Sequence, residues 1–310
     1  MSLYSFKGRK IENQDLGMTR IFYKILYASF GLFAKLPFAA IYFISDCIDF
    51  LVYRIFKYRK EVIFSNLKNS FPEKSEAEIK QIAKKFYAHL ADTLVETIKI
   101  AGMDITDFQQ RVVVKNTELL NNFYEEGKSV VIFCAHYGNW EWVLFICKML
   151  KHTVLPIYQP LNNPYSDAYF YRLRAKFGGV PTPMQETLRA LLHYKKQKQP
   201  TVLWLAADQT PAPENAYWTT FLNQDTAFYM GGEKIAKKMH QPAVFMFIKK
   251  IARGKYEMGF KLMEEQPENL LEGMLTQQYV DILEQTIQEE PAYWLWSHKR
   301  WKHQRTKKEE

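Results

Sequence analysis

From Arg111 onward, short β-rich runs alternate with longer segments of helical periodicity, and this alternation limits the possible folds more than any other feature of the chain. Runs of about four to eight branched and aromatic residues suit buried strands, and amphipathic segments suit the helices that connect them. The order predicts an α/β fold with a mostly parallel central sheet flanked by helices. The expected strands are 111–115, 129–135, 153–158, 201–206 and 243–249, and the expected helices are 116–126, 139–151, 164–177, 185–197, 228–240 and 274–289.

The first third of the chain is expected to be helical. Ser75 and Glu78 have the spacing of a capping box, and a helical stripe of apolar residues runs from there to about Gly102. The preceding segment, 21–56, is crowded with aromatic and aliphatic residues, but charged residues interrupt it before any apolar run reaches the roughly 18 residues of a spanning helix. We expect helices that lie in a membrane interface or dip into it. The alternative is a pair of ordinary buried helices.

The chain is therefore divided into an N-terminal helical, membrane-associating segment, 1–58, and one larger domain, 59–310. Within this domain, 59–110 is expected to be helical, 111–298 to be the α/β core, and 299–308 to be a frayed basic tail. The first residues lack the layout of a cleaved signal peptide, because Lys7, Arg9, Lys10, Glu12 and Asp15 come before any compact apolar run.

The chain is basic, with 42 Lys and Arg against 33 Asp and Glu and a net charge of +9. Such a charge favours anionic partners, either phospholipid, phosphorylated glycolipid or nucleic acid. Nucleic acid is not expected, because the aromatic residues lie in apolar segments and are not interleaved with Lys and Arg. The three cysteines, Cys47, Cys134 and Cys147, lack the paired spacing of a zinc site and are expected to be reduced core residues. No metal site is expected.

His136 is the strongest candidate for chemistry. It follows the buried strand 129–135 directly, and ligands of open α/β sheets bind at the carboxyl ends of strands. Gly138 permits a tight turn, Asn139 suits a helix N-cap, and Glu141 would fall in the first helical turn. We expect the Glu141 carboxylate to reach back to one ring nitrogen of His136, which leaves the other nitrogen free as a base. The alternative is a histidine satisfied by a local hydrogen bond.

A covalent acyl-enzyme is not expected. The chain has no G-x-S-x-G nucleophile turn, and Cys134 is expected to point to the opposite strand face from its neighbours. The base would instead activate a hydroxyl of the acceptor directly.

Four segments together resemble one known family. They are His136-Tyr-Gly-Asn-Trp-Glu141, Arg174-Ala-Lys-Phe-Gly178, Leu205-Ala-Ala-Asp-Gln209 and Pro291-Ala-Tyr-Trp-Leu-Trp-Ser-His-Lys-Arg-Trp-Lys302. With these segments the chain, from about Arg59 to Lys302, resembles the bacterial lipid A biosynthesis acyltransferases. These are the lauroyl and myristoyl transferases of the lysophospholipid acyltransferase superfamily. One segment, 221–232, departs from the family pattern, so the length of the acyl chain cannot be inferred.

The resemblance implies a role for each of these residues. His136 would be the base and Glu141 the residue that orients it. Arg174 would bind an anionic group of the substrate, with Arg172 as its rival, Asp208 would order Arg174 or a loop, and Asn139 is counted with the substrate-binding residues. Without the resemblance, a solvated helix face explains the two arginines and a plain turn explains Asp208. Trp294 and Trp296 are expected to be structural.

The function implied is transfer of an acyl group from acyl-carrier protein, or from acyl-CoA, to a hydroxyl of a lipid A precursor. The reaction would take place at the cytoplasmic face of the inner membrane and would need no cofactor. A lysophospholipid or aminolipid acceptor is an alternative that would use the same residues. A non-catalytic basic membrane-binding protein is an alternative from another class.

Overall fold

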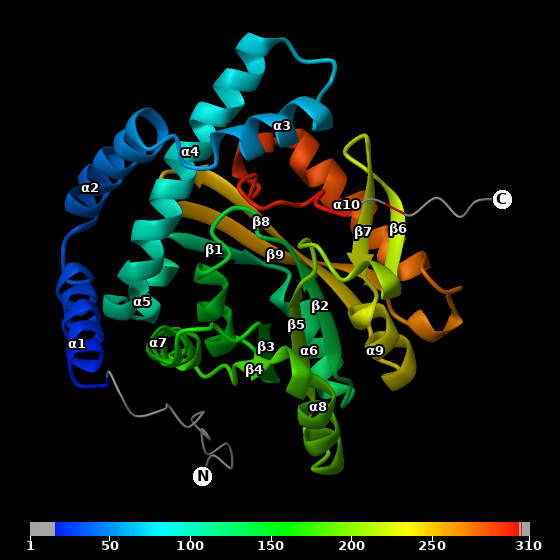
Figure 1. Cartoon of the computed structure of the whole chain (residues 1–310). Helices are drawn as coiled ribbons and strands as arrows, with labels where there is room; N and C mark the ends of the chain where they lie inside the picture. Colours follow the sequence, from blue (N-terminus) through cyan, green and yellow to red (C-terminus); the bar gives the residue numbers. More distant parts are fainter. Residues whose placement is uncertain (1–15, 304, 306–310) are drawn as a thin grey trace.

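The structure is a computed structural model that describes residues 16–303 and 305 (Figure 1). The sequence prediction about a signal peptide depends on Lys7 to Asp15 and lies outside the described residues, as does the end of the basic tail, 306–308.

A seven-stranded sheet forms the centre of the molecule, in the order β1-β9-β8-β2-β5-β3-β4 (Figure 1). All neighbouring strands are parallel except β8 and β9, which form an antiparallel hairpin. The predicted α/β fold with a mostly parallel sheet is therefore confirmed. The strands are β1 Val112–Lys115, β2 Val130–Cys134, β3 Thr153–Tyr158, β4 Thr182–Pro183, β5 Thr201–Ala206, β8 Ala243–Ala252 and β9 Lys255–Glu264.

β2 and β5 are neighbours in the middle of this sheet, and their register fixes the site described below. Cys134 at the end of β2 lies opposite Ala206 at the end of β5. Both strands leave the sheet at the same edge because they are parallel. The chain therefore brings residues 136 and 208, each two positions further on, to the same place.

Two hydrophobic cores cover the two faces of the sheet. Side chains alternate along a strand, so Val131 and Phe133 pack into one core while Val130, Ile132 and Cys134 pack into the other. The first core includes residues of α3 Lys60–Ser70, α4 Glu76–Lys99, α8 Thr187–Lys196, α9 Gly231–Met239 and α10 Met274–Glu289. The second includes residues of α5 Ile105–Gln109, α6 Thr117–Glu125, the 3₁₀ helix η3 Trp142–Lys148 and α7 Pro164–Ala175.

Several elements differ from the sequence prediction. The helix expected at 139–151 is the 3₁₀ helix η3, and the helix expected at 228–240 begins only at Gly231, because its first residues belong to β7 Gln224–Tyr229. β7 pairs with β6 Ala216–Phe221 in a separate hairpin, whose turn is made by two residues with positive φ, Leu222 and Asn223. β9 was also missed. Charged residues interrupt its apolar pattern, and Lys255, Lys261 and Leu262 are exposed.

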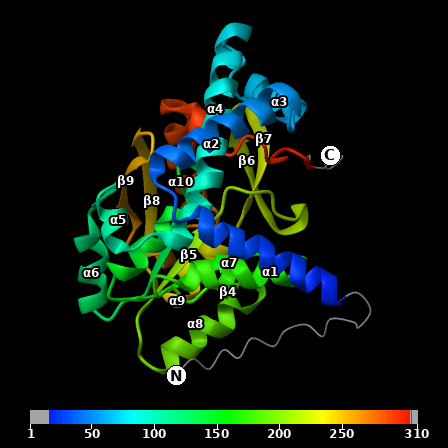
Figure 2. The same ribbon diagram turned by 90° about the vertical axis from the view of Figure 1, so that its left-hand side faces the viewer.

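The N-terminal helices lie along one side of the molecule (Figures 1 and 2). They are α1 Leu16–Phe33 and α2 Phe38–Phe50, followed by the π-helical turn η1 Leu51–Ile55. α1 packs on α7, where Tyr27 stacks on Tyr169 at 4.3 Å between ring centroids. In the part of the chain that the structure describes, no helix combines the length and the apolar character needed to cross a membrane. The outer surface of these three elements nevertheless exposes large apolar side chains: Ile21, Phe22, Ile25, Leu32, Phe43, Phe50, Leu51 and Ile55.

Two smaller predictions are corrected. Cys134 and Cys147 are buried free thiols as expected, but Cys47 is exposed and is not a core residue. The basic tail is not frayed at its start, because Arg300 is fully buried and Trp301 is partly buried against the first core.

A buried glutamate on α4 holds the turn that follows β2. Glu96 is 0% exposed, and its two carboxylate oxygens accept hydrogen bonds from Tyr42 (2.7 Å), from Tyr256 (2.7 Å) and from the side-chain amide of Asn139 (2.6 Å). The Asn139 side-chain oxygen in turn accepts from the backbone N–H of Trp142 at 3.0 Å. α2, α4, β9 and the turn after β2 are thus joined at one carboxylate.

We predict that Glu96→Gln destabilises the fold by about 1–3 kcal/mol, the usual cost of a buried polar group without a partner. An amide has one acceptor oxygen, so its N–H₂ group would face a donor that the carboxylate now satisfies. Chemical denaturation measures the effect. Glu76→Gln is the control, because Glu76 lies on the same helix but is exposed and takes part only in surface ion pairs. Equal stability of the two variants would contradict the role given to Glu96.

Candidate active site

His136 and Asp208 meet at the shared edge of β2 and β5. The Nδ1 atom of His136 lies 2.7 Å from one carboxylate oxygen of Asp208, and the other oxygen accepts a hydrogen bond from the His136 backbone N–H at 3.0 Å. Asp208 is 2% exposed, so it is a buried carboxylate that contacts the histidine twice. A carboxylate accepts hydrogen bonds only, so Nδ1 carries the proton and Nε2 is left as the basic nitrogen.

The C-terminal segment from Pro291 to Lys302, called the signature segment below, contacts both Asp208 and the turn that carries His136. The indole N–H of Trp294 donates to Asp208 at 2.9 Å. The backbone N–H of Leu295 donates to the carbonyl oxygen of His136 at 3.1 Å, and the backbone N–H of Gly138 donates to the carbonyl oxygen of Tyr293 at 2.9 Å. The aromatic segment therefore ties down both the histidine turn and the carboxylate that holds the imidazole. The structural role expected for Trp294 includes this contact with Asp208.

The turn after β2 requires glycine at position 138. Gly138 has φ +59°, and a Cβ built on it would lie 2.7 Å from Cγ2 of Ile248. His89 on α4 holds the same residue from the other side, because its Nε2 atom lies 3.1 Å from the Gly138 carbonyl oxygen. Burial lowers the pKa of His89 to about 3, so this imidazole is neutral and donates from Nε2. The sharp turn allows His136 to leave the sheet edge with its ring toward Asp208.

The charges around His136 favour a protonated ring. Burial alone lowers the pKa of the imidazole, but the charge and hydrogen bond of Asp208, together with the charge of Glu141, outweigh it and raise the pKa above its ordinary value of 6.5. The same pairing lowers the pKa of Asp208, although burial of that carboxyl acts in the opposite direction. Asp208 is therefore ionised, and it stabilises the imidazolium that forms when His136 takes a proton.

The amide of Gln209 is the neighbour of the basic nitrogen of His136. The His136 side chain is 21% exposed, and the amide nitrogen of Gln209 lies 3.3 Å from Nε2. Trp140 packs edge-on against the imidazole, with 5.5 Å between ring centroids. A hydroxyl group that replaced Gln209 at Nε2 would be in position to give up its proton.

The expected hydrogen bond from Glu141 to His136 is not found. Asp208 occupies Nδ1 instead, because the chain after β5 delivers a carboxylate to the edge where His136 leaves β2. The side chain of Glu141 is close enough for its charge to raise the pKa of His136, and it is partly exposed. The prediction that Glu141 holds the ring is therefore corrected, and Asp208 takes that part.

The structure distinguishes between the two arginines that were rivals for substrate binding. Arg174 lies on α7, partly exposed, and its charge lowers the pKa of His136, so the guanidinium is near the site. Its guanidinium carbon is 5.2 Å from the ring centroid of Tyr158 and 5.8 Å from that of Phe170. Arg172 is exposed on the same helix, and none of the described charges that shift the pKa of His136 belongs to it. Of the two rivals, Arg174 is favoured.

Asn139 is not placed to bind a substrate. It is 0% exposed, and both ends of its amide are used within the protein, one by Glu96 and the other by Trp142. The residue caps the first turn of η3, as its N-cap chemistry predicted. Its place among the substrate-binding residues is therefore corrected.

Sequence reasoning missed Gln209, Glu96 and the direct contact of Asp208 with His136. The contact between Asp208 and His136 was partly indicated by the sequence, because both residues directly follow buried strands of a parallel sheet. Predicting the contact also required the strand order, which makes β2 and β5 neighbours. Glu96 had no such indication, because a single glutamate in an amphipathic helix does not differ from a solvated one. The thiol of Cys134 is buried, and that burial raises its pKa to about 12.

The chain is similar to a known family of proteins over most of its length. A family model described as bacterial lipid A biosynthesis acyltransferase matches residues 9–303. The chain is similar to a protein of Haemophilus influenzae named lipid A biosynthesis acyltransferase, with 24% identity over 63% of this chain and 61% of that protein. The match therefore spans less than two thirds of this relative's length. This chain is also similar to the lipid A biosynthesis lauroyltransferase of Escherichia coli, with 22% identity over 87% of this chain and 88% of that protein.

A solved structure, the 1-acyl-sn-glycerophosphate acyltransferase of Thermotoga maritima, aligns with 88% of this chain and 99% of that one at 16% identity and a TM-score of 0.36. A likeness at that TM-score establishes nothing about this chain. The family match over nearly the whole length is the finding that decides. The chain belongs to the bacterial lipid A biosynthesis acyltransferase family.

Proposed function

We propose that this chain transfers a fatty acyl group from an acyl thioester to a hydroxyl of a lipid A precursor, with His136 as general base. The observation that carries the proposal is an imidazole whose Nδ1 is held by a buried carboxylate 2.7 Å away, while its side chain is 21% exposed at the edge of the sheet. That is the arrangement a base needs to take the proton of an incoming alcohol. Family membership supports the acyl transfer and the lipid A type of acceptor.

The acyl group passes directly from the thioester to the acceptor, without an acyl-enzyme. Nε2 of His136 takes the hydroxyl proton as the acceptor oxygen attacks the thioester carbonyl carbon. The carbon–oxygen bond forms, the tetrahedral intermediate collapses, and the carbon–sulfur bond breaks. The leaving sulfur takes the proton back from Nε2, so the products are an ester and a free thiol. Asp208 stabilises the imidazolium while the proton is on His136.

The remaining charges suit anionic substrates. Arg174, held against Tyr158 and Phe170, forms no ion pair within 4.0 Å in the described part of the chain, so its guanidinium is available to grip a phosphate or carboxylate. Acyl-carrier protein, or alternatively acyl-CoA, is the proposed donor. Both are anionic, and the net charge of +9 favours their approach.

The outer surface of α1, α2 and η1 is proposed to lie in the membrane interface at the cytoplasmic face of the inner membrane. Phe22, Ile25 and Phe43 are 60%, 65% and 69% exposed there, respectively. Eight large apolar side chains exposed on three consecutive elements suit contact with a membrane interface better than contact with water alone. Lipid acceptors would then reach the site without leaving the bilayer surface.

The proposal is tested with purified protein, labelled acyl-carrier protein or acyl-CoA, and three acceptors: a lipid A precursor, a lysophospholipid and an aminolipid. We expect the lipid A precursor to be acylated and His136→Ala to abolish turnover. Asp208→Asn should lower kcat by about 10²–10⁴, because the ring loses the partner that fixes its tautomer. Glu141→Gln should retain more activity than Asp208→Asn. Normal turnover by His136→Ala would refute the mechanism, and acylation of only another acceptor would refute the substrate.

The pH profile of kcat/KM tests the electrostatics separately. The active form of His136 is neutral, so activity should fall as pH falls through its pKa, and the midpoint should lie above 6.5 because the pKa is raised. Removing a negative charge destabilises the imidazolium, so Asp208→Asn should move the midpoint to lower pH, and Glu141→Gln should move it in the same direction. Measurement from about pH 5 to 9 covers the expected midpoint of the native chain and of both variants. An unmoved midpoint in both variants would show that another group is being titrated.

Membrane binding is tested by co-sedimentation with vesicles that contain anionic phospholipid. We expect the double variant Phe22→Ser and Ile25→Ser to bind at least about tenfold more weakly, because fully burying each of these side chains is worth about 1.5–3 kcal/mol. The control is Leu188→Ser and Leu192→Ser on α8, two exposed leucines at 49% and 54% on another element. If the α8 variant lost as much binding as the α1 variant, the proposed surface would be wrong.

A further inference from the structure

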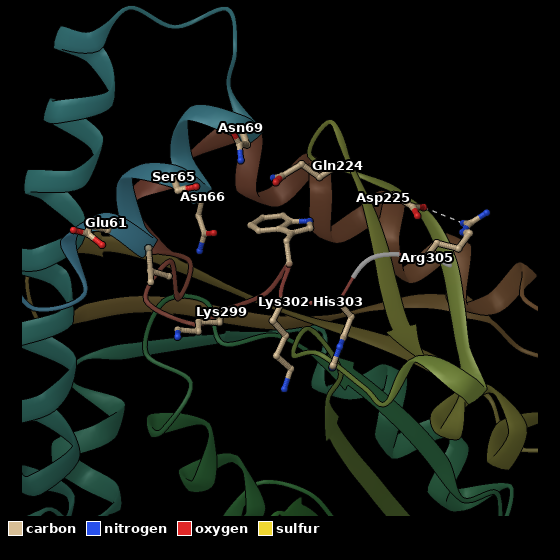
Figure 3. Close-up of a pocket in the computed structure, with 12 residues that line it drawn as sticks. Glu61, Ser65, Asn66, Asn69, Gln224, Asp225, Lys299, Lys302, His303 and Arg305 are labelled. Atoms are coloured by element: carbon tan, nitrogen blue, oxygen red, sulfur yellow. Dashed lines mark ion pairs between the residues drawn. The ribbon is translucent and has the colours of Figure 1, made fainter. Parts of the chain in front are cut away.

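A groove lies between α3, the β6–β7 hairpin and the C-terminal segment from Lys299 to His303 (Figure 3). Its volume is about 730 Å³, which is the size of a ligand site for a small molecule. Figure 3 shows Ser65, Asn66 and Asn69 on α3 and Gln224 on β7 along one side, with Lys299 and Lys302 extending from the C-terminal segment on the other. None of the residues assigned to the proposed reaction lines this groove.

The lining is suited to hydroxyl groups. The amide of Asn69 and the hydroxyl of Ser65 can donate and accept hydrogen bonds, and the Glu61 carboxylate can accept. The side-chain oxygen of Gln224 can also accept, while its nitrogen donates to Ser70 at 3.1 Å. Trp301 also lines the groove, and its indole N–H is fixed by a hydrogen bond of 2.7 Å to Thr226, so an aromatic ring is held in place there. Amides, a carboxylate and a fixed aromatic ring can together bind a polyhydroxylated ring.

The groove also has cations that no acidic side chain neutralises. Arg305 pairs with Asp225 at 3.0 Å, which accounts for one positive and one negative charge (Figure 3). Lys299 and Lys302 are exposed, and neither has an ion pair within 4.0 Å among residues 16–303 and 305. Glu61 is the remaining acidic side chain that lines the groove, so the positive charges outnumber the negative ones. The balance favours a ligand with an anionic substituent such as phosphate.

The groove adjoins the active site through the signature segment. Asn66 donates from its side-chain nitrogen to the carbonyl oxygens of Trp296 (2.9 Å) and His298 (3.0 Å). The imidazole of His298 then accepts from the backbone N–H of Thr210 at 3.3 Å, two residues beyond Asp208. Burial lowers the pKa of His298 to about 4, and the charges of His136, Asp208 and Lys302 all act on it. His298 is thus close enough to both Lys302 and His136 to be affected by their charges.

We propose that this groove binds a phosphorylated saccharide, the headgroup of the acceptor whose hydroxyl His136 activates. Lys299 and Lys302 hold the phosphate, the amides of α3 and β7 hold ring hydroxyls, and Trp301 packs against the sugar. The assignment to the acceptor rests on the proposed function, but the binding chemistry of the groove is independent of it.

The test is a titration of ¹⁵N-labelled protein with glucose 1-phosphate, followed by the indole N–H signal of Trp301, which is assigned from its loss in Trp301→Phe. Glucose and inorganic phosphate at the same ionic strength are separate titrations. We expect a saturable shift with glucose 1-phosphate and weaker binding of each component alone. The double variant Lys299→Ala and Lys302→Ala should bind at least about tenfold more weakly. Lys195→Ala and Lys196→Ala, which remove the same charge from the end of α8, should bind as the native chain does.

Three results would overturn the proposal: no shift of the Trp301 signal, an unchanged affinity in the lysine variant of the groove, or equal binding of inorganic phosphate alone. His136→Ala separates the two proposals, because it should abolish acyl transfer and leave the titration unchanged. Sugar-phosphate binding without acyl transfer in the native chain would end the proposed function and keep the groove. In the acyl-transfer assay, the groove variant should raise KM for the phosphorylated acceptor about tenfold with little change in kcat, and loss of kcat alone would contradict a binding role.

Discussion

The site depends on one buried carboxylate. Taking a charge out of water is costly unless hydrogen bonds replace the lost hydration, and Asp208 obtains three of them: from the backbone and ring of His136 and from the indole of Trp294. These donors come from segments about 70 to 90 positions away in the sequence. β2 and β5 must therefore be paired in register, and the C-terminal segment must lie across their ends, before Asp208 can remain ionised. The same contacts that satisfy the carboxylate fix the orientation of the imidazole.

A second set of buried polar groups, on α4, holds the turn that carries His136. Glu96 holds Asn139, and His89 holds Gly138, so two consecutive residues of the histidine turn are bonded to one helix. Asp92, one turn from each, accepts from Ser45 on α2 and pairs with Lys250 and Arg253 at the β8–β9 hairpin. The helices with the exposed apolar surface are thereby connected to the turn that carries the base. A fully bonded network of this kind specifies one arrangement of the segments, because each broken bond would leave a polar group without a partner.

The parts of the structure that could be predicted were those with a local pattern. Ser75 and Glu78 do form a capping box, Met274–Glu289 is a helix with the predicted bounds, and the strand before His136 was expected because its apolar residues are continuous. The parts that could not be predicted depend on pairing. Leu222 and Asn223 adopt positive φ, although leucine is not a residue that predicts a turn. The charged residues of β9 hide the apolar pattern of a strand, and this strand is hydrogen-bonded to both β1 and β8. Glu141 was expected to hold the imidazole because it is close to His136 in the sequence, whereas the contact between Asp208 and His136 depends on the pairing of β2 with β5.

Two carboxylates near one imidazole have different consequences, and their positions explain why. Asp208 is buried and directly bonded, so it fixes which nitrogen is protonated and supplies most of the rise in the pKa of His136, whereas Glu141 is partly exposed and acts through its charge alone. A higher pKa makes the imidazole a stronger base but leaves less of it neutral near pH 7, so the benefit of each added charge has a limit. Burial of His136 and the charge of Arg174 oppose the rise. An anionic substrate that bound Arg174 would weaken this opposition, so the base would become stronger when the site is occupied.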